Sequence, residues 1–244
     1  MSETNLKAKV ESLFWLGRYA QGETISKAKA ENLFWLGRYT QRVYIILHFL
    51  RKYRDRMIDE DENAYSLFCG KLGIENIYTS REDFLHRYLF DQSNNNSLIS
   101  KLAYASNNAT ILREEIKSET FAYIQMSICH IERCAGDSDL SALQPVTDSL
   151  LAFWGSVDER IHNRDVRNMI KAGKYLETFD LYARFDYPYG RIIYLLNRLE
   201  KHIEKEKSIF DQNLFLEIKS EVEHAGDGYN KAKVLSKLNQ LFIV

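Results

Sequence analysis

Hydrophobic residues recur at helical spacing along most of the chain. Between Leu33 and Leu50 apolar side chains return every three or four residues, which predicts one long helix from about Lys29 to Met57. The same periodicity predicts further helices at about residues 63–71, 80–90, 98–134, 140–161, 165–185, 189–207, 212–224 and 230–242. No convincing alternation of apolar and polar residues marks a strand. The pattern therefore predicts an all-α fold, a multi-helix bundle.

Local signals mark where some of these helices begin and break. Ser80 opens one of them, with Asp83 three residues later at the spacing of a capping box. Ser118 followed by Glu119 resembles a new helix start, so we expect a bend or break near Lys117. The sequence contains only two prolines, which favours helices over its whole length.

A tandem repeat occupies the N-terminal region. Residues 7–21 (KAKVESLFWLGRYAQ) align with residues 27–41 (KAKAENLFWLGRYTQ) and differ at only three positions. A shift of 20 residues along one helix turns its face by about 200°, so an uninterrupted helix would point the two LFWLGRY copies in nearly opposite directions. Gly22 and Thr24 offer a break between the copies. Only the second copy continues into the long apolar helix, and we predict that it is the core helix.

The role of the first copy is open between three arrangements. It is a frayed arm, an additional docked helix, or a competitor that exchanges with the second copy in its own groove or in that of a partner chain. We favour the additional helix, because an exchange requires two packings that differ by only a few kcal/mol. Exchange between two chains would join them into a homo-oligomer through the repeat.

The charge balance narrows the classes of partner. The formal net charge is −1, so no global excess of positive charge attracts nucleic acid or an anionic membrane. The longest apolar run, residues 43–50, is far shorter than the roughly 20 residues that span a bilayer. Three cysteines cannot form a full disulfide framework, and we interpret them as reduced thiols. These features predict a cytoplasmic protein without nucleic-acid or membrane partners.

Two Glu-x-x-His pairs raise the alternative of a di-metal helical bundle. Glu159 precedes His162, and Glu221 precedes His224, at the spacing that such metal sites use. Both pairs lie at predicted helix ends, where the helix dipole already explains a histidine. No GxxxxGK[ST], GxGxxG or GxSxG motif marks a nucleotide site or an activated nucleophile. We therefore expect no metal and no other cofactor.

Three segments together resemble the bacterial alpha-E domain family. Residues 30–42 (AENLFWLGRYTQR) are similar to its opening helix, residues 107–121 (NNATILREEIKSETF) to a central helix, and residues 170–180 (IKAGKYLETFD) to a second LGRY-type helix. The resemblance covers about residues 28–199. It divides the chain into an N-terminal extension, residues 1–26, that carries the first LFWLGRY copy, and an alpha-E-like helical domain, residues 27–244.

The Glu-Arg pair that names this family is incomplete in both LGRY-type helices. The first helix keeps Arg42 but has Gln41 where glutamate is usual, and the second keeps Glu177 but has Thr178 where arginine is usual. If a pseudo-twofold axis relates the two helices, Arg42 faces Glu177. The missing acid and base could then have been lost together without leaving a buried charge.

Four further polar residues match the family pattern on helices that must pack: Arg38, Lys174, Arg113 and Glu119. In one interpretation they complete a buried ionic network that fixes helix register, and we favour this structural role. In the other, the arginines at 38, 42 and 113 bind a carboxylate or phosphate, with Glu177 or Glu119 as the base. The sequence identifies no catalytic residue beyond this hypothesis.

The resemblance also implies a biological setting. Genes and domains of this family tend to occur beside ATP-grasp ligase-like, transglutaminase-like and proteasome-related proteins. It therefore implies an accessory helical protein that binds a partner, such as an ATP-grasp-type ligase or a transglutaminase-like protein, or a peptide substrate in a peptide-modification system. The alternative is an enzyme that uses the polar residues named above. We favour the accessory protein over the enzyme.

Overall fold

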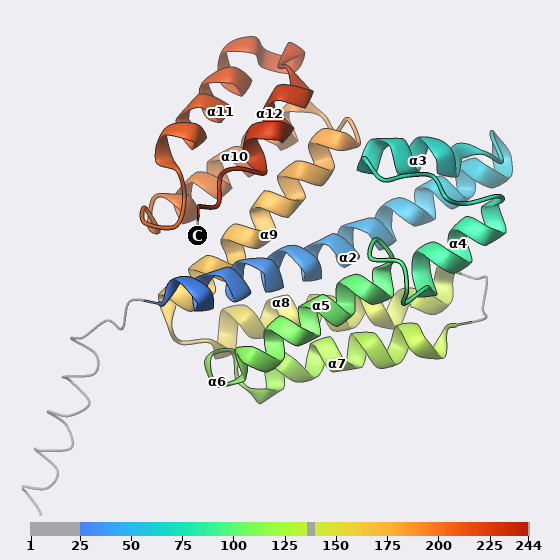
Figure 1. Cartoon of the computed structure of the whole chain (residues 1–244), viewed down its shortest axis with the longest axis horizontal. Coiled ribbons are helices and arrows are strands. Elements are labelled where there is room, and N and C mark those ends of the chain that lie inside the picture. The colour runs from blue at the N-terminus through green and yellow to red at the C-terminus, as the bar shows by residue number, and fades with distance from the viewer. Residues whose placement is uncertain (1–24, 136–139, 244) are drawn as a thin grey trace, which may run out of the picture.

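The computed structural model describes residues 25–135 and 140–243, and this part of the chain is built from helices (Figure 1). The long helix α2 (Lys27–Asp59) runs through the middle of the molecule. Helix α9 (Arg164–Arg184) packs along one side of α2 and helix α5 (Leu98–Ile111) along the other. The predicted all-α, multi-helix bundle is confirmed.

The remaining helices surround this central group. Helices α7 and α8 pack against each other beside α5, α3 and α4 lie near the C-terminal end of α2, and α10 to α12 cover α9 (Figure 1). Their bounds are α3 (Ala64–Leu72), α4 (Arg81–Phe90), α6 (Arg113–Ile116), α7 (Ser118–Arg133), α8 (Gln144–Arg160), α10 (Tyr189–Ile203), α11 (Gln212–Ala225) and α12 (Lys231–Leu238). Short 3₁₀ turns at Leu140–Leu143 and Gly226–Gly228 join some of them.

The second copy of the repeat is the start of α2, as predicted. Ser26 caps the helix by accepting a hydrogen bond from the backbone N–H of Lys29 at 3.4 Å. Ala30, Leu33 and Leu36 are fully buried, so the LFWLGRY segment packs into the interior. The first copy, and with it the choice between its three arrangements, lies outside the described residues.

The predicted break near Lys117 is confirmed. Lys117 has a φ of 70°, a left-handed conformation that ends α6 and lets α7 begin at Ser118. Two other predicted helices are shorter than expected. Helix α10 ends at Ile203 rather than near residue 207. Helix α12 ends at Leu238 rather than near residue 242, and Phe242 forms an isolated β-bridge with Phe210.

The apolar interior consists of two clusters placed end to end along α2. The first joins residues 30–36 of α2 to most buried residues of α9 and to α10–α12. The second joins residues 43–57 of α2 to α3, α4 and the beginning of α5. The polar stretch of α2 at residues 38–42 therefore lies at the junction of the two clusters. None of the helices within residues 25–243 combines the length and apolarity needed to cross a bilayer.

Candidate functional site

Helices α2 and α9 approach each other closely where both carry glycine. A Cβ atom built on Gly37 would overlap the carbonyl oxygen of Ile170, and a Cβ on Gly173 would overlap the carbonyl oxygen of Phe34. These contacts are reciprocal, because Gly37 matches Gly173 and Phe34 matches Ile170 when the two LGRY-type segments are aligned. A local pseudo-twofold axis therefore relates the two helices at their crossing. Any side chain at either glycine would separate the backbones.

One turn further along, the same reciprocity pairs the family's motif positions. On one side, Arg42 Nε donates a hydrogen bond to Glu177 Oε1, and the two side chains form an ion pair. On the other side, Gln41 Nε2 donates to Thr178 Oγ1 at 3.0 Å. The expectation that Arg42 faces Glu177 is confirmed. A charged pair thus occupies one half of the crossing and a neutral pair the other, so neither half contains an unpaired charge.

Arg38 completes the environment of Glu177. Its Nε donates to Glu177 Oε2 at 2.7 Å, so two arginines occupy the two oxygens of a carboxylate whose side chain is only 1% exposed. The Arg38 guanidinium also lies over the Trp35 ring, 4.9 Å from its centroid. Arg38, Gln41, Arg42, Glu177 and Thr178 are called the polar centre below.

The electrostatics keep Glu177 ionised. Burial alone would raise the pKa of this carboxyl, but the positive charges and hydrogen bonds of Arg42 and Arg38 lower its pKa below the ordinary value. Burial opposes the charge on Arg42, yet Glu177 and Asp180 together raise the pKa of Arg42. A carboxylate with both oxygens bonded and a lowered pKa is poorly suited to accept a proton from a substrate. The arrangement is that of a structural ion pair.

The network extends to two residues that the sequence analysis missed. Arg42 Nη2 lies 3.8 Å from Asp180 Oδ2, and Arg184 Nε donates to that oxygen at 2.9 Å. Arg184 also donates to the backbone carbonyl of Leu72, which connects the network to α3. The i,i+4 spacing of Asp180 and Arg184 was a local signal for this pair. Their connection to Arg42 depends on the crossing of two helices that are distant in sequence.

Two predicted members of the network lie elsewhere. Arg113 and Glu119 are exposed, and the nearest ionic contact of Glu119 is with Arg160 at 4.0 Å on the surface. Their expected place in a buried ionic network is wrong. The reason is the break at residue 117: around it Leu112, Ile116 and Thr120 take the inward positions and turn the charged neighbours outward.

Lys174, the counterpart of Arg38 on α9, also does not join the polar centre. Its ammonium group lies 4.1 Å from the centroid of the Trp154 ring. Burial lowers the pKa of Lys174 to about 8, although nearby Asp158 opposes the shift. Both cations lie over an indole ring, but the pseudo-symmetry does not relate the two rings, because Trp35 belongs to α2 itself and Trp154 to α8.

The residues of the di-metal alternative are spread over two helices. His162 follows the end of α8 and is exposed, whereas Glu221 lies on α11 and forms an ion pair with Lys233 at 2.5 Å. His224 Nδ1 donates a hydrogen bond to the backbone carbonyl oxygen of Ser220 at 2.8 Å. In the described part of the chain, no three His, Cys, Asp or Glu side chains lie close enough together to hold a metal ion. No disulfide joins the three cysteines, of which Cys69 is buried and Cys129 exposed.

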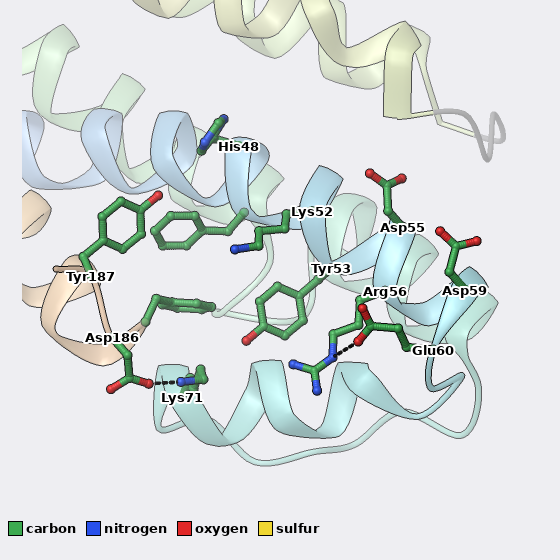
Figure 2. A pocket seen from close by; sticks show the side chains of 12 residues that line it. His48, Lys52, Tyr53, Asp55, Arg56, Asp59, Glu60, Lys71, Asp186 and Tyr187 are labelled. Carbon is green, nitrogen blue, oxygen red and sulfur yellow. Dashed lines mark hydrogen bonds and ion pairs between the residues drawn. The ribbon is translucent and has the colours of Figure 1, made fainter.

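A cavity of about 520 Å³ opens at the other end of α2, where α3 and the connection between α9 and α10 meet it (Figure 2). We call it the aromatic pocket. Its wall is a group of packed rings: the centroid of Phe49 lies 4.4 Å from that of Phe185 and 5.6 Å from that of Tyr187. Tyr53 meets Phe185 edge to face. The remaining lining residues are His48, Lys52, Asp55, Arg56, Asp59, Glu60, Lys71 and Asp186.

Charged groups of both signs surround these rings. Arg56 pairs with Glu60 at 3.2 Å, and Asp186 forms ion pairs with Lys71 and with Lys231 of α12. Asp186 has a φ of 56°, a left-handed conformation that aspartate tolerates better than most residues. Figure 2 shows the Lys52 side chain extending toward the rings, and none of the other residues drawn there forms an ion pair with it. The pocket therefore presents aromatic faces beside the ammonium group of Lys52.

The polar centre allows a direct test of the pseudo-symmetry. Gln41→Glu alone places a carboxylate opposite Thr178 in a nearly sealed position, and Thr178→Arg alone introduces a cation there, so we expect each to destabilise the fold by about 2 kcal/mol. The double variant restores an ion pair that mirrors Arg42 and Glu177. We expect a coupling energy of at least about 1 kcal/mol in its favour, measured by urea unfolding. Additive losses would contradict the reciprocal arrangement.

The fold and the polar centre define a class: an all-helical bundle in which two related helices cross at glycines and pair Glu-Arg motif positions. The family model described as "Alpha-E: A predicted alpha-helical domain with a conserved ER motif" matches residues 26–187, which is more than half of the chain. The chain therefore belongs to the Alpha-E family. The searches of curated proteins and of solved structures give no match.

Proposed function

We propose that this Alpha-E protein is an accessory binding protein that holds a partner protein or a peptide substrate in the aromatic pocket. One observation carries the proposal: in a cavity of about 520 Å³, four aromatic side chains converge with the ammonium group of Lys52. Ligand sites commonly combine apolar and aromatic walls with a few polar groups that fix orientation. The aromatic pocket has this composition.

The chemistry of the pocket suits a segment of polypeptide. The faces of Phe185 and Tyr187 can cover an apolar or aromatic side chain, because both are only partly buried in the free protein. Lys52 can bind a carboxylate of the same segment, either a side chain or a chain terminus. Asp55 and Asp59, on the opposite rim, can bind a basic side chain. A peptide offers all three kinds of group within a short length.

The polar centre is a weaker candidate for substrate binding. Both oxygens of Glu177 are already bonded to arginines, and its side chain is almost completely buried. A ligand that competed for these arginines would leave Glu177 buried without a partner, which costs several kcal/mol. An enzyme based on this centre therefore requires a rearrangement of α2 against α9.

The biological setting follows from the genes and domains that tend to occur beside members of this family. An ATP-grasp-type ligase or a transglutaminase-like protein would supply the chemistry of a peptide-modification system, and the chain itself would position the peptide or the enzyme. The sequence supports this division, because it contains neither a GxxxxGK[ST] nor a GxGxxG phosphate-binding motif. We place the system in the cytoplasm, where an ATP-dependent ligase has its nucleotide.

Capture in the native host tests the proposal. The tagged full-length chain is expected to co-purify with an ATP-grasp-type or transglutaminase-like protein, identified by mass spectrometry. Lys52→Glu reverses the charge that faces the rings, and we expect it to reduce recovery by at least about tenfold. Lys201→Glu makes the same charge change on the exposed face of α10 and serves as the control. Equal recovery by the two variants, or recovery of neither class of protein, would refute the proposal.

A further inference from the structure

A second cavity, of about 450 Å³, lies between the start of α9 and the end of α10. Its lining is dominated by basic side chains: Arg164, Arg167 and Lys171 from α9, and Lys205 just beyond α10. We propose that this basic cavity is a binding site for the phosphate group of a small phosphorylated molecule. The site shares no residue with the aromatic pocket, so either proposal can be refuted without the other.

The charge around the cavity is not balanced. Asp165 is the one carboxylate among the residues that line it, against four cations. Two other carboxylates lie nearby. Asp158 is paired with Lys171 and neutralises that cation, and Glu206 accepts a hydrogen bond from the neutral amide of Asn168 at 3.2 Å and keeps its own charge. Arg164 and Lys205 are exposed and form no ion pair with any described residue. Positive charge is therefore available to a ligand.

The inner wall of the cavity is held in place by hydrogen bonds. Asn168 is 5% exposed, and its Nδ2 donates to the backbone carbonyl of His202 at 3.0 Å. Its Oδ1 lies 2.7 Å from Nδ1 of the His202 ring, and since this oxygen only accepts, the ring carries a proton on Nδ1. The ring is further fixed by stacking on Tyr175, with centroids 5.2 Å apart. The wall is thus formed before any ligand arrives.

Arg167 forms the opposite wall. Its Nη1 donates to the backbone carbonyls of Ile161 and, at 3.4 Å, of His162, which follow the last residue of helix α8. These bonds fix the position of the guanidinium group and leave its other nitrogens for a ligand. The first turn of α9 begins at Arg164, and its cap Asn163 already accepts hydrogen bonds from the backbone N–H groups of Asp165 and Val166, so side chains rather than the helix end supply the contacts to a ligand.

The titration of His202 agrees with a positive potential in the cavity. Its pKa is lowered to about 4, first by burial and then by the positive charges of Lys205 and Lys171. A phosphate group fits this surplus better than a single carboxylate, because it carries more charge and more acceptor oxygens than one carboxylate can offer to several separate cations. The chemical class we assign is therefore a phosphate ester or diphosphate rather than a monocarboxylate.

Calorimetric titration of the full-length chain with sodium pyrophosphate, inorganic phosphate and citrate tests this site. We expect saturable binding of pyrophosphate to one site, and weaker binding of phosphate. The R164Q/K205Q variant should lower the pyrophosphate affinity by at least about tenfold. It should also fold normally, because neither residue has an ionic partner and a cation at a helix N-terminus is unfavourable.

The R113Q/R133Q variant removes the same charge from exposed positions on α6 and α7 and is the matched control. Its affinity should stay within about twofold of wild type. Non-saturable binding, or an equal loss in both variants, would overturn the proposal in favour of diffuse attraction. Citrate binding as tightly as pyrophosphate, with the same dependence on Arg164 and Lys205, would overturn the assignment to phosphate.

Discussion

Replacing Glu177 by glutamine is expected to lower the free energy of unfolding by about 3–5 kcal/mol, a large part of the stability of an ordinary domain. The carboxylate accepts hydrogen bonds from Arg38 and Arg42, and its side chain is 1% exposed. A neutral amide of the same shape leaves two partly buried guanidinium groups without a counter-charge. Urea unfolding followed by circular dichroism measures the loss.

Glu119→Gln is the matched control for this variant. It makes the same chemical change on an exposed carboxylate whose contact with Arg160 is 4.0 Å long, so we expect a change of less than about 0.5 kcal/mol. A loss below about 1 kcal/mol for Glu177→Gln would show that the polar centre does not hold α2 and α9 together.

Gly37→Ala is expected to cost about 3 kcal/mol or more. The added methyl group would meet the carbonyl of Ile170, which belongs to the backbone of α9 and cannot rotate away. The helices must therefore separate, and the ion pair one turn away loses its geometry. Gly173→Ala should have a similar effect, since the contact is reciprocal. Thermal and urea unfolding measure both variants.

Gly155→Ala is the matched control for Gly37→Ala. Gly155 lies within α8, and a Cβ atom there would meet nothing within 4 Å. Alanine favours helix, so this variant should gain about 0.5–1 kcal/mol. If Gly37→Ala and Gly155→Ala gave the same sign, the close crossing of α2 and α9 would not be a constraint on the fold.

The helices were predictable because their signals are local. The apolar period of α2, the capping residue Ser80 and the break at Lys117 all follow from residues within a few positions of one another. The pair Arg42 and Glu177 was predictable for another reason: an internal resemblance between two helices implied the axis that brings them together. No such resemblance predicted the contact of Asp180 with Arg42 of α2, or the hydrogen bond from Arg184 to Leu72 of α3.

Two features of the structure, the outward direction of Arg113 and Glu119 and the aromatic pocket, do not follow from local sequence patterns. Arg113 and Glu119 have apolar neighbours, but the direction of each side chain depends on how the short helix α6 meets α7. The aromatic pocket was not predicted at all, because Asp186, between α9 and α10, is far in the chain from Lys52 of α2 and Lys71 of α3. Such convergence is set by tertiary packing rather than by any local pattern.

The geometry of the polar centre has a consequence for an exchange between the repeat copies. If residues 7–21 replaced residues 27–41 in the α2 groove, Val10 would take the fully buried place of Ala30, and Gly22 would take the place of Arg42. Glu177 would then lose one of its two arginines. An exchange of this kind is therefore expected to weaken the polar centre.

We propose that the polar centre is structural and that partner or peptide binding belongs to the aromatic pocket. Capture from the native host by Arg42→Lys and Lys52→Glu chains, compared at a temperature where circular dichroism shows both folded, tests it most directly. The Arg42→Lys chain keeps the charge opposite Glu177 and is predicted to recover the ATP-grasp-type or transglutaminase-like partner as wild type does, whereas the Lys52→Glu chain loses it. Loss of the partner by folded Arg42→Lys, with full recovery by Lys52→Glu, would contradict the account.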